Sequence, residues 1–198
     1  MVIKVGVIPA KAVAGFVFDA EGKAVGNCSV YSGFAQQGVK TDSEGKFTLP
    51  VLPKDKKIDL FAVSVDKKLA GIITVVPESI EPVKITVLPT KDYAGKVADS
   101  DGMPFGKISF YVDLWLDGKS IYSVREEITA DNESKFTLHS ACPAGTYGFW
   151  WRGDDGTNRD FDYGNVQVKM SGVTEKTPLT ITAKRYIECI MGKVVDKD

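Results

Sequence analysis

The stretch VKITVLPTKDYAGKVADSDG (residues 83–102) decides the fold, because two other stretches repeat its pattern. Residues 3–22 read IKVGVIPAKAVAGFVFDAEG, and residues 179–198 read LTITAKRYIECIMGKVVDKD. Each has an alternating apolar run, a short break, and a glycine followed by a strand-like Val-x-Asp. This pattern fits the last strand of one unit, a short linker and the first strand of the next. We therefore expect one small domain repeated in tandem.

The first repeat consists of short alternating apolar runs separated by Gly, Pro, Asn and Asp, which is typical of an all-β fold. Strands are expected at Ala14–Phe18, Cys28–Ser32, Gly38–Thr41, Lys46–Leu49, Asp59–Val65, Ala70–Val76 and Val83–Leu88. Apolar residues that alternate with polar ones should face between two sheets. These are Val17, Val30, Phe47, Leu49, Phe61, Val63, Ile73 and Ile85.

The second repeat matches the first with a spacing that grows along the chain. Gly15 matches Gly95 at an offset of 80, and Gly95 matches Gly192 at 97. Between them, Phe47 matches Phe136 and Phe61 matches Phe149. The increases fall between strands, where loops absorb insertions. One insertion contains Asp117-Gly118 between alternating runs, which predicts a hairpin turn.

This matching divides the chain into four parts. We expect residues 1–9 to be the last strand of a preceding repeat or an N-terminal strand, and residues 10–89 the first β-sandwich. Residues 90–185 would form the second sandwich with enlarged loops, and residues 186–198 the start of a following repeat. The alternative is that both end segments complete the two sandwiches, for example by strand exchange.

Composition and charge narrow the range of partners. Lys and Arg (25) nearly balance Asp and Glu (26) in the 198 residues, and they are mixed along the chain, so no basic face for nucleic acid is indicated. No apolar run approaches the ~20 residues that cross a bilayer, so no membrane insertion is expected. The first residues lack a signal-peptide pattern, so either the protein is cytosolic or its export signal lies outside this segment.

The three cysteines, Cys28, Cys142 and Cys189, do not have metal-ligand spacing. We expect them to be small buried hydrophobic residues. A Cys142–Cys189 disulfide is the alternative, and it would require an oxidising compartment.

The turn motifs resemble those of the carboxypeptidase regulatory-like domain. The pattern reads Gly15-Phe16-Val17-Phe18-Asp19-Ala20-Glu21-Gly22, followed by Thr41-Asp42-Ser43-Glu44-Gly45-Lys46-Phe47-Thr48-Leu49-Pro50. The second copy has Gly95–Pro104 and Asp131–Leu138, with Ser134 in place of the turn glycine and a turn that we expect to be one residue longer. The resemblance covers roughly residues 12–185.

This resemblance implies two tandem seven-stranded Greek-key β-sandwiches of the prealbumin-like, Ig-like kind. It also implies an exported protein in which such domains serve as spacers, adhesive modules or companions of enzymes, so an extracytoplasmic location is expected: secreted, periplasmic or at the cell surface. The family shares no catalytic residues. Expected partners are neighbouring repeats or other surface proteins.

An enzymatic function is not indicated. The single histidine, His139, precedes Ser140 and Cys142, but neighbouring strand residues point to opposite faces and no orienting third group is evident. There is no Gly-rich nucleophile elbow and no phosphate-binding loop. We expect a structural, non-enzymatic protein without a cofactor.

The enlarged loops of the second unit hold the candidate binding residues. Aromatic rings beside Asp and Asn are typical of sugar-binding surfaces, so a carbohydrate-binding module is the alternative function. The candidates are Trp115, Trp150, Trp151 and Tyr163. The competing interpretation is that these rings only pack the enlarged unit.

Calcium is a further alternative, because one loop is rich in hard oxygen ligands. The candidate ligands are Asp154, Asp155, Asn158, Asp160 and Asp162. Their spacing only partly matches a calcium loop, so a solvated acidic loop is the competing interpretation.

Overall fold

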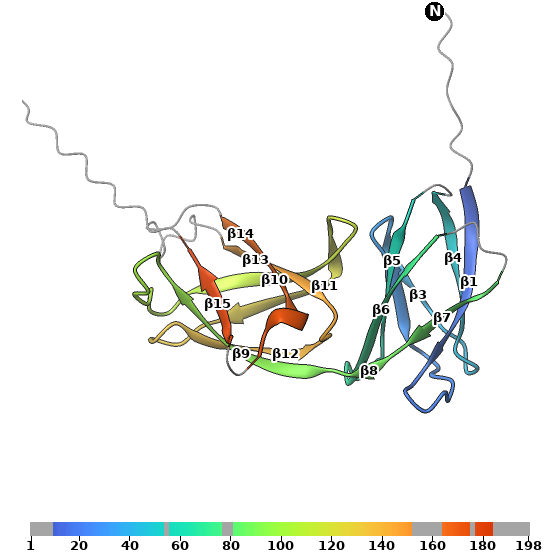
Figure 1. Ribbon diagram of the computed structural model, residues 1–198, viewed down its shortest axis with the longest axis horizontal. Helices are drawn as coiled ribbons and strands as arrows, with labels where there is room; N and C mark the ends of the chain where they lie inside the picture. The colour runs from blue at the N-terminus through green and yellow to red at the C-terminus, as the bar shows by residue number, and fades with distance from the viewer. Residues whose placement is uncertain (1–9, 54–55, 77–80, 152–163, 175–176, 184–198) are drawn as a thin grey trace, which may run out of the picture.

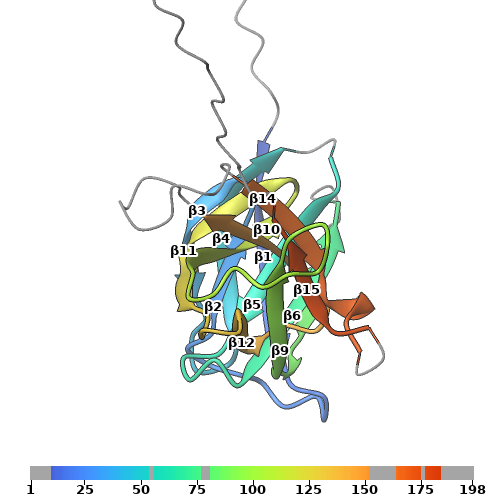
Figure 2. The ribbon, with the colours of Figure 1, turned by 90° about the vertical axis from the view of Figure 1, so that its left-hand side faces the viewer.

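The computed structural model describes residues 10–53, 56–76, 81–151, 164–174 and 177–183. Its strands form two β-sandwiches that lie side by side (Figure 1). Figure 2 shows the second sandwich in front of the first. The structure confirms the predicted all-β class with two sandwiches. The end segments 1–9 and 186–198 lie outside the described residues.

The first sandwich packs the sheet β4-β1-β7 against the sheet β3-β2-β5-β6-β8. Strand β7 runs parallel to β1, and the other pairs are antiparallel. The strands are β1 (Ala10–Phe18), β2 (Ser29–Ser32), β3 (Ala35–Lys40), β4 (Lys46–Pro53), β5 (Ile58–Val63), β6 (Leu69–Val75), β7 (Val83–Thr86) and β8 (Leu88–Pro89). Strand β5 ends two residues before the predicted Val65, because Ser64 begins a turn in which its carbonyl accepts from the Lys67 N–H.

The second sandwich repeats this arrangement, with sheets β12-β9-β15 and β11-β10-β13-β14. Strand β15 runs parallel to β9, as β7 does to β1. The elements are β9 (Lys91–Ala98), β10 (Ser109–Leu116), β11 (Lys119–Thr129), β12 (Lys135–Ala141), β13 (Thr146–Trp151), β14 (Gly164–Lys169), the 3-10 helix η1 (Met170–Gly172) and β15 (Leu179–Thr182). In the described part of the chain, no helical segment has both the length and the apolar character that a membrane crossing requires.

Each sandwich has its own apolar core. Of the predicted inward residues, Val17, Val30, Phe47, Leu49 and Ile85 are buried in the first core, and Ile73 packs partly against it. The prediction is wrong for two residues of β5. Phe61 and Val63 point away from this core, which Ile58, Leu60 and Ala62 fill instead.

The turn motifs form as predicted. Asp19 Oδ1 accepts from the N–H groups of Glu21 and Lys23, and Asp42 Oδ1 accepts from those of Glu44 and Lys46. Gly22 and Gly45 follow with φ of 80° and 74°, where a glycine avoids a steric penalty.

The corresponding turn of the second unit differs from the sequence-based expectation. Asp131 Oδ1 accepts from the N–H groups of Glu133 and Lys135, four residues on as in the first unit, so the turn is not longer. Ser134 takes the glycine position at φ 60°. Its buried hydroxyl donates to the Gly106 carbonyl at 2.9 Å, which offsets the backbone strain.

Candidate functional site

The β10–β11 hairpin of the second unit reaches to the first sandwich (Figure 1). Asp117 and Gly118 form its two-residue turn with φ of 52° and 72°. Two positive φ values in succession identify a type I′ turn, as the Asp-Gly pair predicts. The insertion in the second unit is therefore a lengthened hairpin whose tip contacts the neighbouring unit.

An apolar cluster joins the two units. It consists of Phe61, Ala70, Leu114, Leu116, Ile121 and Cys142, all at most 4% exposed, and we call it the inter-unit cluster. Phe61 and Ala70 come from β5 and β6, and the others come from the second unit. Tyr31 and Ile72 of the first unit pack against it. Burial of this kind stabilises by about 1.5–3 kcal/mol per large side chain.

Polar contacts fix the hairpin tip on the first unit. The N–H of Asp59 donates to both carboxylate oxygens of Asp117, at 3.0 and 3.1 Å. Burial raises the pKa of the Asp117 carboxyl. A Cβ on Gly33 would lie 2.6 Å from the Leu116 carbonyl oxygen, so this close approach requires glycine. Lys119 Nζ lies 4.1 Å from the centroid of the Phe34 ring.

The connection between the sandwiches is short and hydrogen-bonded. Only Thr90 separates β8 from β9. Its N–H donates to the Lys68 carbonyl and its hydroxyl to the Lys67 carbonyl, both at 2.9 Å. The two units are therefore joined both by a one-residue linker and by the inter-unit cluster.

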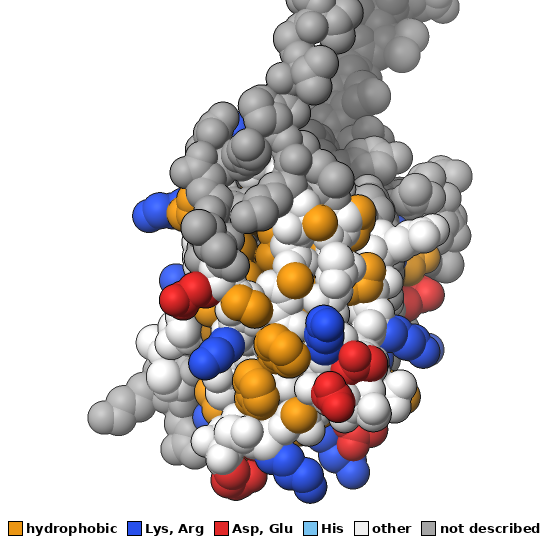
Figure 3. Space-filling model, turned by 90° about the vertical axis from the view of Figure 1, so that its right-hand side faces the viewer, with side chains coloured by type: hydrophobic (Ala, Val, Ile, Leu, Met, Phe, Trp, Pro, Cys, Tyr) orange, Lys and Arg blue, Asp and Glu red, His pale blue; other side chains and the backbone are white. Residues whose placement is uncertain are grey.

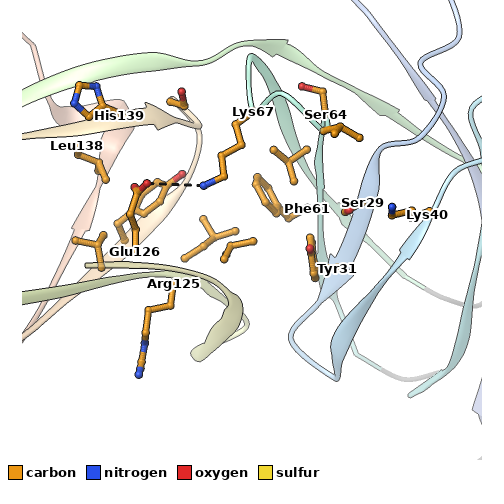
Figure 4. Close-up of a pocket in the computed structure, with 17 residues that line it drawn as sticks. Ser29, Tyr31, Lys40, Phe61, Ser64, Lys67, Arg125, Glu126, Leu138 and His139 are labelled. Atoms are coloured by element: carbon orange, nitrogen blue, oxygen red, sulfur yellow. Dashed lines mark ion pairs between the residues drawn. The ribbon is translucent and has the colours of Figure 1, made fainter. Parts of the chain in front are cut away.

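A cavity of about 280 Å³ lies beside the cluster (Figure 4). Tyr31 and Phe61 line it from the first unit, with ring centroids 6.2 Å apart. Lys67 Nζ reaches across to Glu126 Oε1 at 3.8 Å, although both side chains remain largely exposed. An exposed pair of this kind contributes little stability, about 0–1 kcal/mol, so the apolar cluster dominates the contact.

His139 also borders this cavity, on the second unit. The sequence indicated no orienting group for it, but Asp92 Oδ2 lies 2.9 Å from His139 Nδ1. Asp92 Oδ1 accepts from the Ser140 N–H at 2.8 Å. Both hydrogen bonds lower the pKa of the Asp92 carboxyl, and the one from the Ser140 N–H has the larger effect. Both side chains of the pair are more than half exposed, so it lies at the solvent-facing rim.

Cys142 is a free thiol in the inter-unit cluster. Burial raises its pKa, which disfavours the nucleophilic thiolate. Cys28 is likewise free and buried with a raised pKa. Cys189 lies outside the described residues. Cys142 is therefore a packing residue in this structure, as the sequence predicts for a small hydrophobic side chain.

The predicted residues Trp115 and Trp150 meet on the outer side of the sheet β11-β10-β13-β14. Their ring centroids are 5.7 Å apart and their planes differ by 23°. Both rings are partly exposed. They can approach because Gly148 lies between them. A Cβ there would lie 2.1 Å from Trp115 Nε1. We call Tyr111, Asp113, Trp115, Gly148 and Trp150 the outer aromatic face.

A charged group lies within this face. Asp113 is fully buried, and its carboxylate accepts from Arg125 Nε at 2.7 Å and Arg125 Nη2 at 3.0 Å. Ser120 Oγ also donates to it, at 2.7 Å. Arg125 in turn lies 5.3 Å from the Tyr111 ring centroid. A bidentate pair with a third donor is among the stronger polar arrangements in proteins.

The two indole N–H groups of the face are buried, and neither has a hydrogen-bond partner among the described residues. A buried unpaired donor costs about 1–3 kcal/mol. The exposed parts of the two rings are therefore carbon atoms.

The other predicted site residues are not placed. The side chain of Trp151, the last residue of β13, lies outside the description, as does Tyr163. The same holds for Asp154, Asp155, Asn158, Asp160 and Asp162, so the predicted calcium loop remains a prediction. Elsewhere in the described ranges, no group of three or more His, Cys, Asp or Glu side chains is arranged to hold a metal.

Sequence reasoning missed the inter-unit cluster. The available signal was IDLFAV (residues 58–63), which is apolar on both sides of the strand. A strand that borders water on one side alternates, whereas one buried on both sides does not.

Comparisons with known proteins identify no family. No family model matches the chain, and no curated protein sequence matches it. Among solved structures, it is similar to a streptococcal ancillary pilin, with 11% identity, a TM-score of 0.40, and coverage of 89% of this chain and 62% of the pilin. The chain therefore spans less than two thirds of that pilin's length.

Two further pilus proteins show similarity at the same level. Shaft pilin SpaA from Lactobacillus rhamnosus GG is 13% identical with a TM-score of 0.33, covering 89% of this chain and 97% of SpaA. RrgB from Streptococcus pneumoniae is 9% identical with a TM-score of 0.37, covering 94% of this chain and 48% of RrgB.

Proposed function

We propose that this chain is a non-enzymatic structural module that holds two β-sandwiches in a fixed relative position within a larger exported or cell-surface protein. The main support for the proposal is the inter-unit contact. In it, the lengthened β10–β11 hairpin of the second unit is buried against a sheet of the first unit. A pair of freely jointed domains would not need this contact.

Three features of the contact support rigidity. The cluster buries large side chains from both units, the linker is a single hydrogen-bonded residue, and Asp117 binds a backbone N–H of the first unit. Interfaces within a chain permit domain motion unless they are sizeable and apolar. A spacer requires the opposite behaviour, which these features provide.

The wider context is also part of the proposal. The resemblance of the turn motifs to the carboxypeptidase regulatory-like domain supports an extracytoplasmic location and a tandem array. In that array, residues 1–9 and 186–198 belong to neighbouring repeats, and the partners are those repeats or other surface proteins.

Distance measurements between the units test the proposal. Thr48 and Thr137 are exposed and follow the equivalent phenylalanines of the two units. Spin labels at Thr48→Cys and Thr137→Cys, in a Cys189→Ser background, report the separation by electron paramagnetic resonance. We expect one narrow distance distribution, which broadens in an Asp117→Ala, Ile121→Ala chain. A broad distribution before those substitutions would exclude the rigid spacer.

A further inference from the structure

The outer aromatic face occupies the same position in the second unit as the docking surface in the first. Across β2, β5 and β6, Tyr31 pairs with Phe61 and Phe61 with Ile72. Across β10, β13 and β14, Tyr111 pairs with Trp150 and Trp150 with Asn165. Phe61 therefore corresponds to Trp150, and the earlier match of Phe61 to Phe149 is wrong by one residue because Phe149 faces the core.

The two equivalent surfaces differ in what covers them. In the first unit, Tyr31 and Phe61 lie under the hairpin of the second unit. Gly33, two residues after Tyr31, leaves room for the Leu116 carbonyl. The equivalent of Gly33 is Asp113, whose buried carboxylate fills that space. A hairpin cannot dock on the second unit in the same way, so this face suits a different partner.

The side chains of the face form three rows across the sheet. The first row holds Glu127, Tyr111 and Trp150, and the third holds Ser120, Trp115 and Thr146. Between them lie Asp113 and Gly148, with Arg125 held by Asp113. Polar residues border the aromatic centre. Glu127, Gln167 and Lys169 are exposed and pair with Tyr111, Gly148 and Thr146.

This combination matches the chemistry of a sugar ring. One side of a pyranose carries axial C–H groups, which pack against an aromatic ring, and its edge carries hydroxyl groups that need donors and acceptors. Because the Nε1 atoms of Trp115 and Trp150 are buried, the parts of both rings that remain exposed are carbon atoms. Arg125, Glu127 and Gln167 can satisfy hydroxyl groups at the rim. The rows of side chains across a sheet surface suit a linear chain of pyranose units that lies along them.

We infer that the outer aromatic face binds a linear pyranose polysaccharide. Trp150 contacts the sugar directly. Asp113 is a positioning residue, because it holds Arg125 beside Tyr111. This activity is independent of the spacer function, since the face lies apart from the inter-unit cluster.

Titration with defined oligosaccharides tests the inference. Cellohexaose, mannohexaose and chitohexaose are added separately to the full chain, and tryptophan emission and isothermal calorimetry are followed. We expect saturable binding of at least one probe. Trp150→Ala should weaken it about tenfold or more, since loss of a stacking ring commonly costs about one power of ten in affinity. Arg125→Lys, which keeps the charge but loses the bidentate geometry, should weaken it several-fold.

A matched control exists on the first unit. Phe16 and Phe18 form a partly exposed stacked pair with ring centroids 6.1 Å apart. They lie in β1, on the outer side of the first sandwich. Figure 3 shows this end of the molecule, with apolar side chains interspersed with charged ones. Phe16→Ala should leave sugar binding unchanged.

Three results would overturn the inference: no binding of any of the three probes, binding that Trp150→Ala does not weaken, or an equal loss in Phe16→Ala. Self-association that depends on Trp150 without sugar binding would also overturn it, and would make the face a protein interface. Circular dichroism of each variant identifies a loss that is due to unfolding. If Trp150→Ala unfolds, the affinity of the Arg125→Lys chain for the oligosaccharides becomes the test. An unchanged affinity would then count against the inference.

Discussion

Replacing Ile121 with alanine removes a side chain that is fully buried between the two units. Shortening a buried isoleucine to alanine costs about 2–5 kcal/mol, because apolar contacts are lost and a cavity remains. The urea dependence of unfolding is about 1–3 kcal/mol per molar for small proteins. With a slope of about 2 kcal/mol per molar, we expect the midpoint of unfolding to fall by roughly 1–2.5 M urea.

Each unit has its own spectroscopic or chemical probe. All three tryptophans, at positions 115, 150 and 151, lie in the second unit, so their emission reports its unfolding. Cys28 is fully buried in the core of the first unit, so its reaction with a thiol reagent, measured by mass spectrometry on the peptide that contains Cys28, reports that unit. In the unchanged chain the two transitions should coincide, because the cluster couples the units. In Ile121→Ala they should separate as well as shift.

Val65→Ala is the matched control. Val65 lines the same inter-unit cavity but is 73% exposed, so its truncation should change stability by no more than about 0.5 kcal/mol. If Ile121→Ala behaved like this control, the cluster would not couple the two units. Two separate transitions in the unchanged chain would refute the reasoning equally.

Three further predictions follow from individual residues. Gly45→Ala should lower the thermal midpoint more than Gly22→Ala, because both have positive φ but only Gly45 has a backbone carbonyl 2.6 Å from the added Cβ; equal shifts would contradict this. The thiols of Cys28 and Cys142 should react with iodoacetamide far more slowly in the native protein than in urea, because burial protects them and raises their pKa. Relative to the unchanged chain, Asp117→Asn should gain stability as pH rises from the ordinary aspartate pKa to the raised pKa of folded Asp117, because in that range the unfolded state has released the Asp117 proton and the folded state still holds it. Urea midpoints at several pH values measure this difference, and a constant difference would count against it.

The fold was predictable from local chemistry. Asp-x-x-Gly turns repeat at fixed positions, and alternating strands lie between them. Four such turns form with the same Asp Oδ1 contacts, at Asp19, Asp42, Asp99 and Asp131. Ser134 shows why one of them was misjudged. The sequence shows a missing glycine, but it does not show the Gly106 carbonyl that accepts a hydrogen bond from the Ser134 hydroxyl at positive φ.

The inter-unit contact was less predictable from the sequence. It depends on what the side of β5 that faces away from the first core meets in the folded chain. Alternation places Leu60 and Phe61 on opposite sides of β5 but does not say which side faces the core. Both sides are buried here, one by the first sandwich and one by the second unit. Trp115 and Trp150, singled out from the sequence as candidate binding residues, meet in the structure, and their role in binding stays a prediction. Their meeting depends on Gly148, a glycine that no turn motif marks.

The difference between Gly33 and Asp113 explains why a hairpin covers the surface of the first unit but not the equivalent surface of the second. Gly33 in the first unit permits the Leu116 carbonyl to approach its backbone, so a hairpin covers the aromatic residues beside it. Asp113 in the second unit places a carboxylate in that space, and a buried carboxylate requires donors. Arg125 and Ser120 provide them from β11, the same strand that the lengthened hairpin contributes. The hairpin therefore has two roles. Its apolar side joins the second unit to the first, and its polar side supplies the donors that the buried Asp113 carboxylate requires.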